Sequence, residues 1–253
     1  MELPVSIAIV GKGGVGKSVI TTLIAKVLSE DYSYRILLID ADPSYPHLSK
    51  MVDLEPNRSL EEIRTSTIKK VVEDEKSAKK IAENIDFEVY KTIAENKRFS
   101  LFSMGQPEDP GCFCPSNALL RKVIESISRD FDIVLIDCEA GLEQISRLVI
   151  KTVDIILIVT DISIRSIDTA ISIEKNARKF TDYKMAGIII NKERNDISSL
   201  LKKIQSSNIT LLATIPEDIN ITRFELEGKP LIELPTDTPS LKSVKALVDS
   251  LLN

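Results

Sequence analysis

Short apolar runs recur along the chain, and the segments between most of them carry apolar residues at helical spacing. The runs are rich in Ile, Val and Leu and lack regular polar alternation: VSIAIV (5–10), YRILLID (34–40), FSLFSM (99–104), FDIVLID (131–137), VDIILIVT (153–160), MAGIIIN (185–191) and ITLLATIP (209–216). Strands of this kind are buried on both faces, as in a parallel sheet covered by helices. The pattern predicts an α/β fold: a single doubly wound domain over 1–253, with a mostly parallel sheet of about seven to eight strands between two helical layers.

Two segments add to this picture. Residues 59–98 are charged and mostly helical in pattern, so we interpret them as a solvated helical insertion within the domain. A further helix is expected at about 116–129. The last stretch, PSLKSVKALVDSLLN (239–253), has only two lysines and predicts a helix packed on the domain.

Composition narrows the classes of function. The chain has 253 residues, 43% hydrophobic and 28% charged, with 33 basic against 38 acidic residues. The resulting net charge of −5 gives no reason to expect nucleic acid or an anionic membrane as partner. No apolar stretch approaches the roughly 20 residues of a transmembrane helix, and the first apolar run lacks the basic start of a signal peptide. Three cysteines argue against a secreted disulfide framework, so a cytoplasmic location is expected.

A glycine-rich loop separates the first predicted strand from the first predicted helix. It comprises Gly11, Lys12, Gly13, Gly14, Val15, Gly16, Lys17 and Ser18. The pattern G-x-x-x-x-G-K-[ST] in this context predicts a P-loop NTPase. Glycines let the backbone wrap around phosphates with its N–H groups pointing inward, and the helix N-terminus adds positive charge. Lys17 is placed to contact the β- and γ-phosphates, and the Ser18 hydroxyl to bind Mg²⁺.

A second lysine, Lys12, lies inside this loop, and KGGVGKS resembles the deviant Walker A loop of the superfamily that includes MinD, ParA and the nitrogenase iron protein. The resemblance implies a homodimer in which two chains face each other across two nucleotides. It further implies that Lys12 reaches into the partner's site and stabilises charge developing on the phosphates. Val19, counted with the nucleotide site, stands where relatives often carry threonine, and we expect no consequence for the mechanism.

Carboxylates follow two of the predicted strands, in the stretches IDADP and IDCEAG. The carboxyl ends of parallel strands are where ligands bind in open α/β sheets. The same resemblance implies that Asp42 positions or activates the attacking water and that Asp40 supports the magnesium shell. Asp137 is then the carboxylate that holds Mg²⁺ directly or through water, and Gly141 lets its loop respond to the γ-phosphate.

Another strand ends at Asn191 and Lys192. The amide of Asn191 offers both donors and an acceptor, which suits the edge of a purine. The resemblance implies that this position reads adenine, and that backbone from the later IPED stretch, at Pro216 and Glu217, closes the base pocket. We therefore expect ATP rather than GTP as substrate, hydrolysed to ADP and phosphate with Mg²⁺.

Two of the three cysteines, Cys112 and Cys114, lie one residue apart in PEDPGCFCPSN, a stretch that predicts a loop. A disulfide at this spacing would be strained, and free loop thiols oxidise unless something binds them, which favours a metal. Soft divalent ions take about four ligands, so two copies of the pair across a two-fold axis would make an S₄ site. Cys138 is interpreted as a small residue filling a strand end, and His47 as an ordinary surface or loop residue.

The stretch GQPEDPGCFCPSNALLR (105–121), with the deviant loop and IDCEAGLE, closely resembles the CooC family of nickel-insertion accessory ATPases. The resemblance covers essentially the whole chain, and the Cys-x-Cys loop is its most specific part. It implies that Cys112 and Cys114 bind Ni²⁺ or Zn²⁺ between two subunits of a nucleotide- and metal-dependent homodimer. ATP binding and hydrolysis would then release the metal to carbon monoxide dehydrogenase or acetyl-CoA synthase.

Three other functions fit parts of the sequence. A MinD- or ParA-like positioning ATPase would carry a basic amphipathic terminal helix or a basic DNA-binding surface, which the acidic balance and the stretch 239–253 do not favour. An iron–sulfur carrier ATPase remains chemically possible through a cluster bridging Cys112 and Cys114 of two chains. The third is a structural zinc dimer whose ATPase activity serves another partner.

Overall fold

The computed structural model describes residues 3–42, 47–63, 65–66, 89–106, 126–139, 153–194 and 196–252. Across these ranges eight strands form one sheet in the order β3-β4-β2-β5-β1-β6-β7-β8. The strands are β1 (Val5–Gly11), β2 (Ile36–Ala41), β3 (Ala94–Glu95), β4 (Ser100–Ser103), β5 (Ile133–Cys138), β6 (Ile155–Thr160), β7 (Met185–Glu193) and β8 (Thr210–Pro216). The pairings among β1, β2 and β4–β8 are parallel, and β3 alone pairs antiparallel to its neighbour β4.

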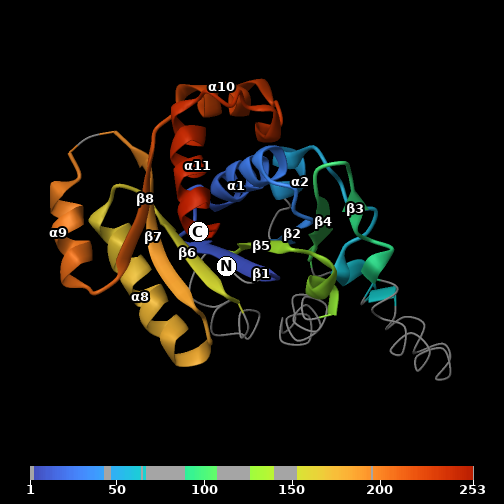
Figure 1. Cartoon of the computed structure of the whole chain (residues 1–253), viewed down its shortest axis with the longest axis horizontal. Helices are drawn as coiled ribbons and strands as arrows, with labels where there is room; N and C mark the ends of the chain where they lie inside the picture. Colours follow the sequence, from blue (N-terminus) through green and yellow to red (C-terminus); the bar gives the residue numbers. More distant parts are fainter. Residues whose placement is uncertain are drawn as a thin grey trace.

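Helices cover both faces of this sheet (Figure 1). Those described are α1 (Lys17–Asp31), α2 (His47–Val52), α8 (Ile164–Phe180), α9 (Ser198–Ser206), α10 (Ile219–Glu227) and α11 (Pro239–Leu252), with 3₁₀ turns η1 (Ser128–Asp130) and η2 (Leu231–Glu233). α1 and α11 pack against each other on one face, while α8 and α9 bury their apolar residues on the other. No described helix has the length and apolar character needed to span a bilayer.

The central strand β1 explains why the predicted strands show no polar alternation. Successive side chains of a strand point to opposite faces of the sheet. Ile7 and Ile9 belong to the core under α1 and α11, whereas Ala8 and Val10 belong to the core under α8. Positions 7–10 therefore all face an apolar layer, and the polar residue Ser6 lies near the start of the strand, where its hydroxyl hydrogen-bonds Asp154.

The predicted fold class is confirmed: a mostly parallel, doubly covered sheet in which all seven apolar runs are strands. The terminal helix 239–253 is observed as α11, with an apolar face buried against α1 and β8. Sequence reasoning missed β3, a two-residue strand inside the predicted insertion 59–98. Much of that insertion, and most of the predicted helix 116–129, lie outside the described residues.

Candidate active site

The glycine-rich loop follows β1 at the centre of the sheet and leads directly into α1. Gly16 has the left-handed conformation (φ +91°) and is the N-cap of α1, so it exposes the first N–H groups of the helix. A Cβ on Gly16 would lie 2.5 Å from Nδ2 of Asn191. The Lys17 ammonium curls back to 3.4 Å from the carbonyl oxygen of Lys12, whose own side chain is exposed. The loop therefore has the conformation expected of a phosphate cradle.

The two predicted strand-end carboxylates lie beside each other. Asp40 on β2 is the register partner of Asp137 on β5, and both are almost fully buried. The Thr21 hydroxyl of α1 donates to Oδ1 of Asp137 at 3.4 Å, and Ser18 also hydrogen-bonds this carboxylate. The N–H of Asp42 donates to Oδ1 of Asp40 at 3.2 Å, whereas Oδ2 of Asp40 is buried with no hydrogen-bond partner.

The surroundings of both carboxyl groups disfavour the charged form and raise the two pKa values. Burial, and then repulsion from Asp137, raise the pKa of Asp40 to about 8. Burial raises the pKa of Asp137 to about 6, although the Ser18 hydrogen bond and the Lys17 charge oppose that rise. A divalent cation would compensate both charges, and carboxylate and hydroxyl oxygens are ligands that Mg²⁺ prefers. The donor set of Ser18, Asp40 and Asp137 therefore fits Mg²⁺.

Magnesium in such sites is held by one or two carboxylates together with substrate phosphates, not by a cage of protein ligands. The described part of the chain contains no group of three His, Cys, Asp or Glu side chains arranged to hold a metal on their own.

A cavity of about 120 Å³ lies beside the loop, between α1, β7 and α10. It is lined by Val19, Asn191, Lys192, Arg194, Pro216, Glu217, Asp218, Ile221, Thr222 and Glu225. All the residues assigned to the base from sequence are therefore brought together here. Asn191 is buried and donates its amide to the Val15 carbonyl at 2.8 Å, so it also ties β7 to the loop.

Sequence reasoning overlooked several residues of this region. Thr21 lies one turn beyond the motif, and no pattern distinguishes its hydroxyl from that of any other helical threonine. Arg194 forms an ion pair with Glu217 at 3.1 Å across the ends of β7 and β8. Asp218 precedes α10 and is its N-cap, a role that the position of an aspartate before a helix does signal.

Of the three cysteines, Cys138 lies in the described part of the chain. Cys112 and Cys114, like Gly141, lie outside the described residues. Cys138 is fully buried at the end of β5, and burial, followed by the neighbouring Asp137, raises the pKa of its thiol. That environment agrees with the interpretation of Cys138 as a small core residue. His47 is exposed at the start of α2.

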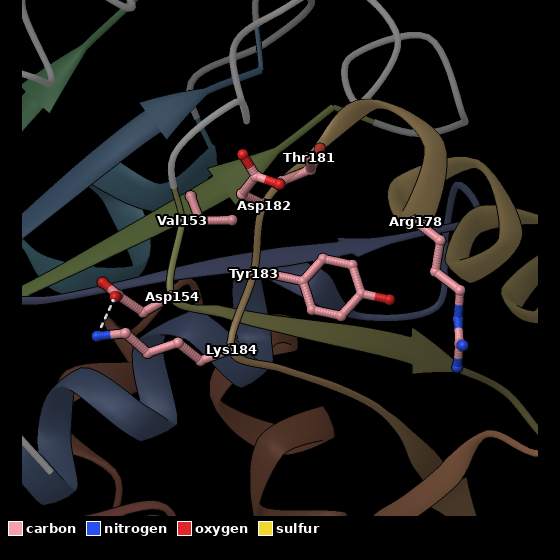
Figure 2. A pocket seen from close by; sticks show the side chains of 7 residues that line it. All are labelled: Val153, Asp154, Arg178, Thr181, Asp182, Tyr183 and Lys184. Carbon is pink, nitrogen blue, oxygen red and sulfur yellow. Dashed lines mark ion pairs between the residues drawn. The ribbon is translucent and has the colours of Figure 1, made fainter.

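A larger hollow of about 650 Å³ lies at the opposite, amino end of the strands, lined by residues from 153–154 and from the end of α8 to the start of β7 (Figure 2). Three of its charged groups, Asp154, Arg178 and Lys184, form ion pairs. Lys184 contacts Asp154 at 2.8 Å, and Arg178 forms an ion pair with Glu174. No residue singled out from the sequence lines this hollow, so we place the active site at the loop.

Comparison with known proteins extends these observations. The family model for the CobQ/CobB/MinD/ParA nucleotide binding domain matches residues 7–231. An uncharacterized ATP-binding protein of Methanocaldococcus jannaschii is 33% identical over 252 residues, with 98% of both chains covered. The carbon monoxide dehydrogenase accessory protein CooC of Rhodospirillum rubrum is 29% identical over 238 residues, covering 90% of this chain and 89% of CooC.

Among solved structures, the septum site-determining protein MinD of Pyrococcus horikoshii, complexed with Mg-ADP, matches with a TM-score of 0.73. The two are 21% identical, and the match covers 98% of this chain and 95% of MinD. At this identity the likeness concerns the fold alone.

The glycine-rich loop at the central strand β1, with buried carboxylates on β5 and β2, defines a P-loop ATPase. The chain belongs to the CobQ/CobB/MinD/ParA nucleotide binding domain family. Nucleotide and Mg²⁺ are the ligands expected for that family.

Proposed function

We propose that this protein is a nucleotide-dependent metallochaperone, in which ATP binding and hydrolysis by a homodimer control the binding and release of Ni²⁺ or Zn²⁺. The recipient would be a carbon monoxide dehydrogenase or acetyl-CoA synthase. The observation that carries the proposal is the pair Cys112 and Cys114 in a chain 29% identical to CooC over nine-tenths of its length. The metal half rests on sequence, because the pair lies outside the described residues.

The nucleotide half is supported by the geometry of the loop and the carboxylates. The backbone N–H groups of the loop and the Lys17 ammonium would hold the phosphates. Ser18, Asp137 and Asp40 would hold Mg²⁺, which supplies charge neutralisation on the β- and γ-phosphates. Asp42 is partly exposed beside this group and would position the attacking water. Asn191, Lys192, Pro216 and Glu217 would receive the adenine.

The homodimer connects the two halves. Lys12 is exposed on the loop, where its ammonium is accessible to a facing chain, in line with a role in trans. Four thiolates from two chains would complete one S₄ site on the two-fold axis. Nucleotide closure would change the separation of the two cysteine loops, and since coupling between sites is reciprocal, metal would change nucleotide affinity to the same extent.

The decisive experiment measures metal per chain together with mass in solution. Wild type and Cys112→Ala/Cys114→Ala are titrated with Ni²⁺ and Zn²⁺, in the presence of ADP or a non-hydrolysable ATP analogue. Cys138→Ala is the matched control, because it removes a thiol that the proposal assigns no metal. We expect about one ion per two chains in wild type and in Cys138→Ala, and loss of binding in the double variant.

Nucleotide should shift the metal affinity, which is the observable form of the coupling. Metal binding that survives loss of both cysteines would exclude the proposed site. Metal binding that is indifferent to the nucleotide would remove the chaperone cycle and leave a structural zinc dimer. If wild type binds neither ion, the ATPase has another cargo, and a positioning ATPase becomes the preferred function. Iron and sulfide recovered with the purified dimer would favour the iron–sulfur carrier.

A further inference from the structure

One carboxylate, that of Asp218, joins the starts of two helices. Its Oδ1 accepts hydrogen bonds from the N–H and the side-chain amide of Asn220, both at 2.9 Å, at the N-terminus of α10. Its Oδ2 accepts from the N–H of Ser240 at 3.1 Å and from the Ser240 hydroxyl at 2.6 Å, at the N-terminus of α11. Both residues are buried, Asp218 being 5% exposed and Ser240 0%. Charge-assisted bonds of this kind are stronger than neutral ones.

α11 depends on this carboxylate because its own N-terminal residues do not supply a cap. Thr238 precedes Pro239, the first residue of α11, and a threonine at that position commonly accepts a hydrogen bond from the first turn. Here the Thr238 hydroxyl is buried with no hydrogen-bond partner, while the N–H of Ser240 is taken by Asp218. The start of α11 is therefore held by Asp218, which lies between β8 and α10.

The same residue belongs to the wall of the 120 Å³ cavity. Asp218 lines it with Pro216 and Glu217 before it, and with Ile221 and Thr222 after it in α10. The N–H of Glu217 donates to the Glu193 carbonyl at 2.9 Å, which fixes this wall to β7. α11 packs in turn on α1, the helix that begins at the phosphate loop. Asp218 thus sets the position of the cavity wall relative to the loop.

We propose that Asp218 is a positioning residue for the nucleotide base, acting through the backbone of 216–217 and through Ser240. The inference rests on the proposed assignment of this cavity to the base. The phosphates are held by the 11–18 loop, which Asp218 does not contact. Loss of Asp218 should therefore weaken recognition of the nucleoside part and leave triphosphate binding and the chemical step unchanged.

The test compares two ligands on matched variants. Inorganic tripolyphosphate, measured as an inhibitor of ATP hydrolysis, reports the loop alone, whereas the KM for ATP reports loop and base cavity together. Asp218→Asn keeps the side-chain shape but replaces the carboxylate, which accepts from Ser240, with an amide. Ser240→Ala removes one hydrogen-bond donor to Asp218 with little risk to folding. The control Asp154→Asn alters a similar carboxylate at the far end of the sheet (Figure 2). This carboxylate accepts hydrogen bonds from the N–H of Ser6 at 2.8 Å and from the Ser6 hydroxyl at 2.9 Å.

We expect Asp218→Asn to raise the KM for ATP about five- to tenfold, the effect of one ordinary hydrogen bond, with kcat and the tripolyphosphate inhibition constant within about twofold of wild type. Ser240→Ala should change the KM in the same direction by a smaller factor. Asp154→Asn should leave all three quantities unchanged. Ser240→Ala decides the question if Asp218→Asn does not fold.

A parallel rise of the ATP KM and the tripolyphosphate constant, or no change in either, would overturn the proposal. Arg194→Ala separates this result from failure of the base assignment, because Arg194 lines the cavity and forms its ion pair with the side chain of Glu217, whereas Asp218 bonds Asn220 and Ser240. If Arg194→Ala alone raises the KM, the cavity holds the base and Asp218 is merely structural. If neither does, the base binds elsewhere. None of these assays contains Ni²⁺ or Zn²⁺, so they stand apart from the metal titration.

Discussion

Gly16→Ala tests the contact that joins the phosphate loop to β7. Gly16 adopts φ +91°, a conformation that costs an L-residue about 1–2 kcal/mol. Alanine also restricts the unfolded chain, which returns about 0.4–1 kcal/mol of stability. The backbone effect alone is therefore a net loss of about 1 kcal/mol.

The new Cβ adds a second, larger cost. It would lie 2.5 Å from Nδ2 of Asn191, so the amide must move away and release the Val15 carbonyl that it contacts at 2.8 Å. Asn191 is only 4% exposed, and a buried polar group that loses its partner costs about 1–3 kcal/mol. Together the two effects predict a loss of about 2–4 kcal/mol in the free energy of unfolding.

The assay is urea unfolding without nucleotide, followed by the KM for ATP of each variant. Gly228→Ala is the control for the backbone effect, because Gly228 is also left-handed (φ +65°) and has nothing within 4 Å of an added Cβ. We expect Gly228→Ala to cost about 1 kcal/mol and to leave the KM unchanged. In the double variant Gly16→Ala/Asn191→Ala the alanine no longer meets an amide, so the two losses should be less than additive.

Two results would contradict a contact between the loop and Asn191: the same loss of stability in Gly16→Ala and Gly228→Ala within about 0.5 kcal/mol, or strict additivity in the double variant. Either result would mean that the amide of Asn191 moves aside without cost and that the loop does not depend on β7.

Two further predictions concern the carboxylate cap and the facing chain. Burial alone would raise the pKa of Asp218, but hydrogen bonds from Ser240 and Asn220 outweigh it and hold the pKa below its usual range. The stability that this cap provides is present above the unfolded pKa of about 4 and is lost as pH falls through the lower folded pKa. At pH 7 the Asp218→Asn variant should therefore be less stable than wild type by roughly 1 kcal/mol. This difference, measured by urea unfolding, should shrink towards pH 3. A deficit independent of pH would show that the carboxylate charge contributes nothing. If Lys12 acts in trans, Lys12→Ala should lower kcat about a thousandfold. Mixing this variant with Lys17→Ala chains should restore activity, because each heterodimer retains one intact site. No recovery on mixing would mean that Lys12 acts in the site of its own chain.

Much of the fold was predictable because a doubly covered parallel sheet leaves a strong signal in sequence. Six of the seven strands are buried along most of their length, and the edge strand β8 is half-buried, so each appears as a short apolar run. The strand β3 was missed because two residues, one of them exposed, pair only at the edge of the sheet. The loop 11–18 was predictable because its glycines and Lys17 are consecutive, and a contiguous motif needs no tertiary information.

The class of fold, the phosphate loop, and the carboxylates and amide at the strand ends could all be predicted from the amino-acid sequence alone. These features are local, since they depend on apolar periodicity, on glycine conformations and on residues that directly follow strands. Which of these groups lie in contact depends on the packing of the folded chain. Strand order places Asp40 of β2 beside Asp137 of β5, and brings Asn191 against Val15. The packing of α10 and α11 also brings Asp218 to Ser240, 22 residues further along the chain. No local pattern encodes such contacts, because they arise from how helices and strands distant in sequence pack onto one sheet.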